Sequence, residues 1–330
     1  MYSSDYLTRL QQRMVALDEA AYHEFADLVA VLAWERVKAN GFAGPEAGRF
    51  AKDCSWRLAA RIRDLSGAPV LALEEWLSGE LDAALRQWFT ELARDVLDAG
   101  RVQADLMPNR RLTAAGLEIA SQSRPARVVT GDLHDVFELP DSRILMALGD
   151  ASGHGAAAGL YSSVGLALLR TTLSKVEGPA AILRSLNQAL AGCGACGRYM
   201  TLSLALWERA SGQLRFANAG GKAASMIRGG RSVRVEVPGQ WLGWFPEADY
   251  EEIVVAVQPD DLVVLNSDGI TDQENPAGIP YEEDSLGGFL AACSGLPALE
   301  VTQGVLIDVE RFADGQPQED DQTILVAKVL

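Results

Sequence analysis

The spacing of hydrophobic and polar residues changes near residue 112 and divides the chain into two parts. In the first part, apolar residues recur at steps of three and four, which is the period of a helix that packs on one side. Helices are expected over about residues 7–32, 46–65 and 73–107, separated by Gly- and Pro-containing stretches at 41–45 and 66–69. The first hundred residues are therefore predicted to form an all-helical module.

From about residue 112 onward, short β-rich runs bounded by turn residues replace this helical spacing. Consecutive strands outnumber strand–helix–strand units, so the pattern predicts an α+β fold built on a mainly antiparallel sandwich. Helices are expected over about 156–191, with a break at Gly178-Pro179, and near 284–293 and 298–312. Eight strands are expected, over residues 117–121, 128–139, 143–148, 200–207, 213–219, 253–257, 262–266 and 323–329.

The predicted helix over 73–107 has a further property. Its apolar residues alternate steps of three and four, with an interruption at Asp95, until Pro108 ends the helix. This spacing is close to the seam of a coiled coil. The helix is therefore expected either to pair with a second copy of the chain or to lie on its own domain.

The charge of the chain excludes several kinds of partner. With 29 Lys and Arg against 45 Asp and Glu, the formal net charge is −16, so no general attraction to nucleic acid or to an anionic membrane is expected. No apolar run reaches the roughly 18 residues of a spanning helix, and the N-terminus lacks the pattern of a signal peptide. Four cysteines in 330 residues make no disulfide framework. The cytoplasm is therefore the expected compartment.

Aspartates at the ends of the predicted strands carry the candidate chemistry. Asp132 interrupts an apolar run, Asp150 and Asp268 each end one, and Asp320 and Asp321 precede the last. A carboxylate at the end of a buried strand is costly unless it is paired or bound to a metal, and no Lys or Arg lies within these four motifs. Hard oxygen ligands without compensating cations indicate a divalent ion such as Mg²⁺ or Mn²⁺. The alternative is that Asp-Gly pairs only mark turns.

Ordered motifs cover most of residues 100–330. They are Gln103-Ala-Asp-Leu-Met-Pro108, Val129-Thr-Gly-Asp-Leu-His-Asp-Val-Phe137, Leu148-Gly-Asp-Ala-Ser-Gly-His-Gly155, Tyr199-Met-Thr-Leu202, Phe216-Ala-Asn-Ala-Gly220, Asn266-Ser-Asp-Gly-Ile-Thr-Asp272 and Asp320-Asp-Gln-Thr-Ile-Leu-Val326. Their order resembles that of the metal-dependent type 2C (PPM) serine/threonine protein phosphatases, above all the bacterial sporulation and stress-response (SpoIIE/RsbU-like) branch. Residues 1–100 show no family resemblance.

The resemblance implies a four-layer α-β-β-α sandwich over residues 109–330, preceded by an all-α regulatory or dimerisation module over 1–72 and a linker helix over 73–108. It also implies two Mn²⁺ or Mg²⁺ ions at one end of the sandwich. Asp150 would bridge the ions and, together with Asp132, serve catalysis. The implied metal ligands are Asp132, Asp150, the carbonyl of Ala151, Asp268, Asp320 and, as a weaker candidate, Asp321.

Arg127 and His154 are the candidate phosphate-binding residues, since each lies in or near a metal motif and can donate to phosphoryl oxygens. The alternatives are an Arg127 side chain that faces water and a His154 without a catalytic role. Two positions depart from the commonest family pattern. Thr130 stands in place of a glycine, and Gly221 stands where His is frequent, but the acidic motifs are intact.

The resulting hypothesis is a protein serine/threonine phosphatase that hydrolyses phosphoserine on a regulatory protein, by resemblance an anti-sigma-factor antagonist in bacterial stress or developmental signalling. The alternatives are a catalytically silent phosphatase-like module that binds a regulator, and a hydrolase of small phosphate esters. The helical module is expected to receive an upstream activator and to form a homodimer. The 73–107 helix is expected to dock near the small-residue helix after Gly155 and to control metal occupancy.

Overall fold

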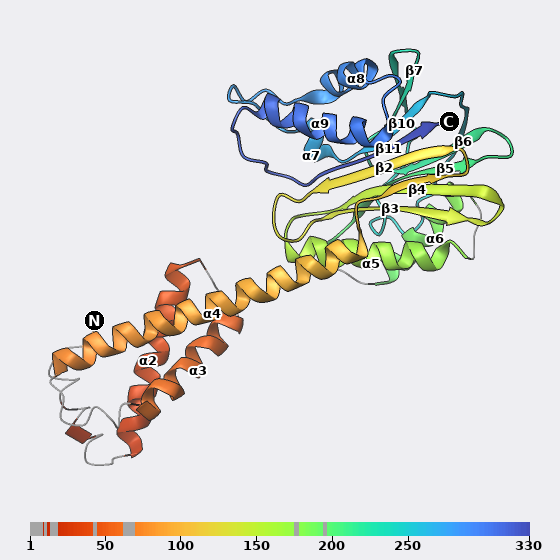
Figure 1. Ribbon diagram of the computed structural model, residues 1–330. Coiled ribbons are helices and arrows are strands. Elements are labelled where there is room, and N and C mark those ends of the chain that lie inside the picture. The colour runs from red at the N-terminus through yellow and green to blue at the C-terminus, as the bar shows by residue number, and fades with distance from the viewer. Residues whose placement is uncertain are drawn as a thin grey trace. The chain divides into compact units, whose positions relative to one another are not determined.

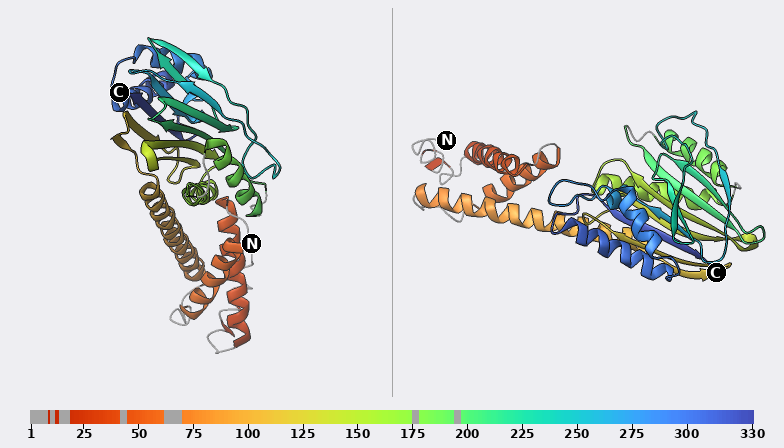
Figure 2. Two further views of the ribbon diagram at one scale, coloured as in Figure 1. Left: turned by 90° about the vertical axis from the view of Figure 1, so that its right-hand side faces the viewer. Right: turned by 90° about the horizontal axis from the view of Figure 1, so that it is seen from above.

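The computed structural model describes residues 9, 12–13, 19–41, 45–61, 70–174, 178–193 and 197–330. The chain divides into two compact units, Met1–Asp95 and Val96–Leu330 (Figures 1 and 2). Helix α4 (Val70–Leu106) contributes its first part to one unit and its last part to the other. None of the described helices is both long and apolar enough to cross a bilayer.

The first unit is helical, as the apolar spacing predicts. Helices α2 (Glu19–Ala39) and α3 (Pro45–Arg61) pack on each other. Leu81 of α4 is buried in the core that they form. A core of this kind comes from helices whose apolar stripes face one another.

The ends of the predicted helices differ in detail from the observed ones. Most of residues 7–18 and all of 62–65 lie outside the described residues. Helix α2 runs to Ala39 instead of residue 32, because Val37 is fully buried in a cluster with Leu85 and so continues the apolar stripe.

The second unit contains two sheets in which all neighbouring strands are antiparallel. The six-stranded sheet has the order β1 (Arg111–Ala114), β2 (Leu117–Arg124), β11 (Gln322–Val329), β10 (Leu262–Asn266), β7 (Ala224–Arg228) and β8 (Arg231–Val235). The five-stranded sheet has the order β3 (Asp132–Leu139), β4 (Arg143–Ala151), β5 (Met200–Glu208), β6 (Gln213–Ala219) and β9 (Ile253–Ala256).

Helices cover the outer face of each sheet, which makes the four-layer α-β-β-α sandwich that was predicted (Figure 1). Helices α5 (Ala156–Thr172) and α6 (Pro179–Gly192) pack on the five-stranded sheet. Helices α8 (Glu282–Ala292) and α9 (Ala298–Ala313) pack on the six-stranded sheet. A third apolar core lies between the sheets and includes Met146.

Strand β3 begins at Asp132 and not at residue 128, where the sequence pattern placed its start. The loop before it is held by the Asp321 carboxylate, which accepts hydrogen bonds from the backbone N–H groups of Ala126 and Gly131, each at 2.7 Å. These bonds use backbone groups that a longer strand would have paired with a neighbour.

Three strands, β1, β7 and β8, were not predicted. Strand β8 contains two exposed arginines, Arg231 and Arg234, and Val233 at its centre is itself exposed, so its hydrophobic signal is weak. Gly229 and Gly230 join it to β7, both with positive φ. A Gly-Gly pair is a recognised hairpin signal, so this hairpin was within reach of sequence analysis.

Candidate metal centre

Strands β3 and β4 bring two of the predicted ligands together. Their antiparallel register pairs Asp132 with Asp150. Because side chains alternate along a strand, both carboxylates lie on the same face as Val136 and Met146, which pack in the core between the sheets. Asp132 is buried, with 2% of its surface exposed, and Asp150 is half-buried. Two acidic side chains therefore stand at one end of the inter-sheet core.

The other sheet supplies the remaining carboxylates. Asp268 comes two residues after the end of β10, as the first residue of the short helix α7 (Asp268–Thr271), while Asp320 and Asp321 precede β11. Burial raises the pKa of Asp150 to about 8, and three neighbouring carboxylates add to the shift. These neighbours are Asp268, Asp320 and Asp321. The structure thus brings acidic residues from both sheets within electrostatic reach of one another.

The cluster has the features of a cation site. Burial and the charge of Asp150 raise the pKa of Asp132 well above its usual range, and Oδ2 of Asp132 is buried without a hydrogen-bond partner. A Cβ placed on Gly131 would lie 2.8 Å from Oδ1 of Asp150 and 3.1 Å from the carbonyl oxygen of Ala151, so these oxygens border one small space. Among the described residues, no Lys or Arg is a leading cause of the pKa shift of Asp132 or of Asp150. Such uncompensated oxygens suit a divalent cation.

The side chains do not form a closed cage. In the described part of the chain, no three acidic, His or Cys side chains meet closely enough to enclose an ion. Asp320 is exposed, and its Oδ1 accepts a hydrogen bond from the backbone N–H of Asp321 at 2.8 Å. Mg²⁺ usually keeps several water ligands and takes only one or two carboxylates. A carboxylate pair with a backbone carbonyl therefore fits such an ion.

Asp321 is a different kind of residue from the other acids of the cluster. Its two oxygens accept the hydrogen bonds from Ala126 and Gly131 that hold the loop leading into Asp132. Its carboxylate is thus already engaged with the backbone. These bonds favour a positioning role for Asp321 over direct metal ligation.

The two candidate phosphate-binding residues lie in loops next to the cluster. Arg127 is in the loop between β2 and β3, and His154 is in the loop between β4 and α5. Both side chains are exposed. The structure therefore places neither of them in the buried part of the cluster.

Lys222 is a basic residue that sequence analysis did not single out. It lines a cavity of about 110 Å³ together with Asp150 and Asp268. Its Nζ lies 3.3 Å from Oδ1 of Asp272 and 3.7 Å from Oε1 of Glu283. Lys222 therefore brings a positive charge to the border of the acidic cluster.

The unusual Gly221, which directly precedes Lys222, is the feature of the sequence that could have pointed to this lysine. The Asn218 side chain accepts a hydrogen bond from the Gly221 N–H and donates one to its carbonyl, both at 2.9 Å. A Cβ on Gly221 would lie 2.8 Å from Oγ of Ser203. A side chain at this position would therefore require the Ser203 hydroxyl group to move.

The pKa of Asp150 predicts how the stability of the metal-free protein depends on pH. Between the ordinary value of 3.8 and about 8, the folded protein holds a proton on Asp150 that the unfolded chain has released. Folding stability therefore falls as pH rises through this window. Burial lowers the pKa of His134 to about 4. Between about pH 4 and its ordinary value of 6.5, His134 therefore makes folding stability rise with pH.

We therefore expect the melting temperature of the metal-free protein to fall by a few degrees between about pH 7 and pH 8, where the raised pKa values of Asp132 and Asp150 act in the same direction. Differential scanning calorimetry measures this slope. Asp150→Asn should reduce it, since the contribution of Asp132 remains, and Mn²⁺ should remove it in the wild type. A melting temperature that rises over the same interval would contradict the prediction.

Comparison with known proteins gives a family model and several relatives. The family model described as Stage II sporulation protein E (SpoIIE) matches residues 140–330. Stage II sporulation protein E of Priestia megaterium is 23% identical over 211 residues, which are 64% of this chain and 36% of that protein. Phosphoserine phosphatase RsbU of Bacillus subtilis (strain 168) is 23% identical over 240 residues, which are 72% of this chain and 71% of RsbU. The chain spans about a third or less of the SpoIIE proteins that it matches.

Solved structures agree on the fold. The SiaA-PP2C domain of Pseudomonas aeruginosa superposes with a TM-score of 0.66 and 25% identity, covering 72% of this chain and 97% of that domain. The PP2C phosphatase domain of SpoIIE from Bacillus subtilis, with a fragment of its regulatory domain, superposes with a TM-score of 0.58 and 22% identity, covering 64% and 62%. The predicted type 2C phosphatase fold is confirmed.

Proposed function

The chain belongs to the stage II sporulation protein E (SpoIIE) family, and from this premise we propose that it is a metal-dependent protein phosphatase that hydrolyses phosphoserine on a regulatory protein. One observation carries the proposal. Asp132 and Asp150 lie opposite each other on β3 and β4, Asp268 lies within electrostatic reach of Asp150, and burial and the charges of neighbouring carboxylates raise the pKa of Asp132 and Asp150.

In this proposal the metal ligands are Asp132, Asp150, Asp268, Asp320 and the carbonyl of Ala151. Two Mn²⁺ or Mg²⁺ ions bound there would supply a nucleophilic water near neutral pH and neutralise charge on the phosphoryl oxygens. The structural support is the unpartnered Oδ2 of Asp132 and the oxygens of Asp150 and Ala151 that border the same space.

Residues around the cluster would orient the substrate. Lys222 can exchange its contact with Asp272 for a phosphoryl oxygen, since it lines the cavity beside Asp150. Arg198 donates to the backbone carbonyl of Ser152 at 2.8 Å and so supports the loop that follows Ala151. Arg127 and His154 remain candidates for phosphate contacts from the two flanking loops.

The substrate that we propose is a serine-phosphorylated antagonist of an anti-sigma factor. Similarity to RsbU, which is named a phosphoserine phosphatase, supports a phosphoserine substrate. The intact acidic cluster favours an enzyme over the alternative of a silent binding module.

The test is incubation of the full chain, with Mn²⁺, with serine-phosphorylated anti-sigma-factor antagonists of the source organism. Mass spectrometry should show loss of one phosphate from one such protein. Binding without phosphate loss would favour the silent module. Hydrolysis of a small aryl phosphate without loss from any phosphoprotein would favour a hydrolase of small esters.

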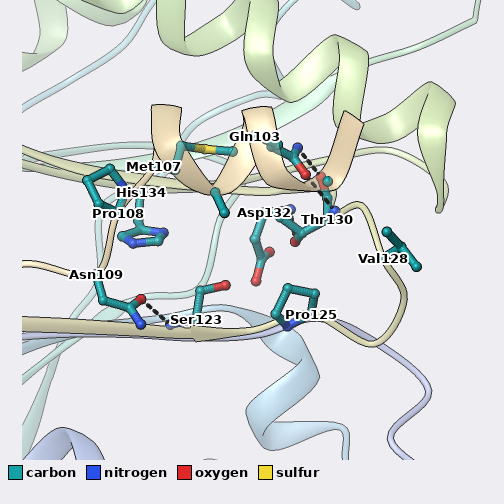
Figure 3. A pocket seen from close by; sticks show the side chains of 12 residues that line it. Gln103, Met107, Pro108, Asn109, Ser123, Pro125, Val128, Thr130, Asp132 and His134 are labelled. Carbon is teal, nitrogen blue, oxygen red and sulfur yellow. Dashed lines mark hydrogen bonds between the residues drawn. The ribbon is translucent and has the colours of Figure 1, made fainter. Parts of the chain in front are cut away.

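The last turns of α4 are hydrogen-bonded to the chain that leads to Asp132. The buried Gln103 side chain donates to the carbonyl of Thr130 at 2.7 Å and accepts from the Thr130 N–H at 2.9 Å (Figure 3). The same amide nitrogen lies 3.3 Å from the carbonyl of Gly159 in α5. Thr130 is two residues from Asp132, so these bonds connect the helix to the cluster.

Arg170 of α5 makes a second connection. It donates to the carbonyl of Leu106 at 2.8 Å and to Oδ2 of Asp135 at 2.7 Å. Asp135 is 2% exposed and also accepts from Arg110 at 2.9 Å. A buried carboxylate with two cationic partners fixes the end of α4 against β3 and α5.

These contacts support the proposal that residues 73–108 form a linker helix between a regulatory module, 1–72, and a phosphatase domain, 109–330. An activator bound to the module would act through the Gln103 bonds on metal occupancy. Leu97, Val102 and Leu106 are exposed on α4. This apolar surface supports pairing with a second copy of the chain.

Gln103→Ala is expected to weaken Mn²⁺ binding about tenfold or more, because residues that orient metal ligands typically contribute that much. Titration calorimetry on the full chain measures the affinity. Gln87→Ala is the matched control, since Gln87 lies on the same helix and bonds only to the exposed Glu91 in the contacts described. Equal affinities for the two variants would refute the connection.

A further inference from the structure

Exposed aromatic residues gather on the loop between β8 and β9. Trp241, Trp244 and Phe245 of this loop are 40%, 45% and 38% exposed. The ring of Tyr199 stacks on Trp241 with centroids 4.4 Å apart, and it is perpendicular to the ring of Trp244 at 5.6 Å. We call these four residues the aromatic patch. Large apolar side chains that are exposed side by side mark a binding surface.

The loop that carries the patch is anchored from beneath. The buried Asn187 side chain of α6 accepts a hydrogen bond from the Gly243 N–H at 2.8 Å and donates one to the carbonyl of Phe245 at 2.7 Å. Leu242 is fully buried and exchanges two backbone hydrogen bonds with Met200. These anchors leave the exposed aromatic rings available to a partner. A surface held in place in this way loses little conformational entropy on binding.

The patch adjoins the acidic cluster. Gly220 lines the cavity beside the cluster, and a Cβ placed on it would overlap the ring of Trp241. Ser152, in the loop that follows Asp150, donates its backbone N–H to the Tyr199 carbonyl at 2.9 Å. Its Oγ accepts from the Tyr199 N–H at 3.0 Å. A peptide whose phosphoryl group reaches the cluster therefore lies next to the patch.

The distance from the cluster to the patch can be expressed in residues of a bound peptide. In the register of β4 and β5, Asp150 pairs with Thr201. Tyr199 comes two residues before Thr201, which is roughly 7 Å along an extended backbone. An extended peptide covers the same length in about two residues. The patch is therefore placed for the side chain two residues from the phosphoserine.

The chemistry of the patch favours an apolar side chain. All four members are uncharged aromatic residues, and Trp and Tyr contribute strongly to binding when a partner covers them. Charged residues of both signs lie close along the chain. Arg198 directly precedes Tyr199 and opposes a second cation, while the exposed Glu247 comes two residues after Phe245 and opposes an anion.

We propose that the aromatic patch binds an apolar side chain of the phosphoprotein substrate, two residues from the phosphoserine. This inference rests on the proposed phosphatase function and adds to it a determinant of substrate choice. The metal ligands act on the phosphoryl group, which all phosphoserine substrates share. The patch then distinguishes one phosphoserine sequence from another.

The test is phosphate release by the full chain, with Mn²⁺, from synthetic peptides in which alanines flank a phosphoserine. The second position on each side carries Leu, Ala, Lys or Glu. We expect kcat/KM to be about tenfold higher for the Leu peptide than for the Ala peptide, because the patch removes apolar surface from water. Lys and Glu should give no increase. A small aryl phosphate, which has no such side chain, is assayed in parallel.

Three variants locate the preference. Trp244→Ala removes one exposed ring and should bring the ratio of kcat/KM between the Leu and Ala peptides close to one. This ratio is unaffected by a general change in activity. Trp244→Phe keeps an aromatic ring and should retain most of the preference. Ile307→Ala is the matched control, because Ile307 is 47% exposed on α9 and is not part of the patch.

Several results would overturn the inference. Hydrolysis of the aryl phosphate without a preference for the Leu peptide, or without hydrolysis of any peptide, would remove the patch from substrate choice and leave the proposed function intact. A preference that persists in Trp244→Ala would place the apolar side chain elsewhere. If that variant instead alters the oligomeric state in light scattering, the patch joins copies of the chain. Failure to hydrolyse either kind of substrate would contradict the proposed function itself.

Discussion

Asp150→Asn is expected to reduce Mn²⁺-dependent phosphate release by at least about a hundredfold. Asp150 is paired with Asp132 in the register of β3 and β4. Burial and the charges of its neighbours Asp268 and Asp320 raise its pKa. The amide has nearly the same shape but no negative charge, so it cannot balance a divalent cation. Phosphate release from a phosphoprotein substrate, or from a small aryl phosphate, measures the loss.

A second readout separates lost chemistry from lost folding. The substitution removes one charge from a cluster whose members repel one another, so the metal-free variant should be at least as stable as the wild type near pH 8. Asp249→Asn is the matched control, since Asp249 is 80% exposed and pairs with Arg184 at the surface. Full activity in Asp150→Asn would remove the proposed role of the cluster.

Gly269→Ala is expected to lower both the stability and the activity of the protein. A Cβ at Gly269 would overlap the backbone carbonyl of Asp321. The backbone φ of Gly269 is not positive, so close approach and not turn conformation requires glycine here. Overpacking of this kind costs about 1–3 kcal/mol. It would also shift Asp320 and Asp321 and lower the rate.

Urea unfolding of the metal-free variant measures the stability loss, and the phosphate assay measures the rate. Gly288→Ala is the matched control, because Gly288 is exposed in α8 and a Cβ there meets nothing within 4 Å. It should leave activity unchanged and leave stability equal or higher by up to about 1 kcal/mol, since Ala favours a helix interior. If the two variants behave alike, the close approach at Gly269 has no consequence.

The parts of the fold with strong periodicity were predictable. Strands β6 and β10 have the predicted ends, and β10 is buried along its whole length. The two helices α5 and α6 are separated at Gly178, where φ is positive and Pro179 follows. Weakly apolar edge strands such as β1, with its exposed Arg111, gave no such signal.

The acidic residues could be identified from the sequence because they lie at the ends of predicted strands, in motifs that contain no Lys or Arg. Their roles as ligands stay a prediction. The contacts of Gln103 with Thr130 and of Lys222 with Asp272 could not be predicted, since each joins residues far apart in sequence through side-chain geometry. The engagement of both Asp321 oxygens with backbone N–H groups belongs to the same class.

Anomalous diffraction from crystals grown with Mn²⁺ tests most directly whether the acidic cluster is a two-metal centre. The account predicts two manganese peaks, both within coordination distance of Asp150, with Asp132 and Asp268 as further ligands and the carbonyl of Ala151 on one ion. Peaks that avoid these oxygens, or no peak at the cluster at saturating Mn²⁺, would contradict it.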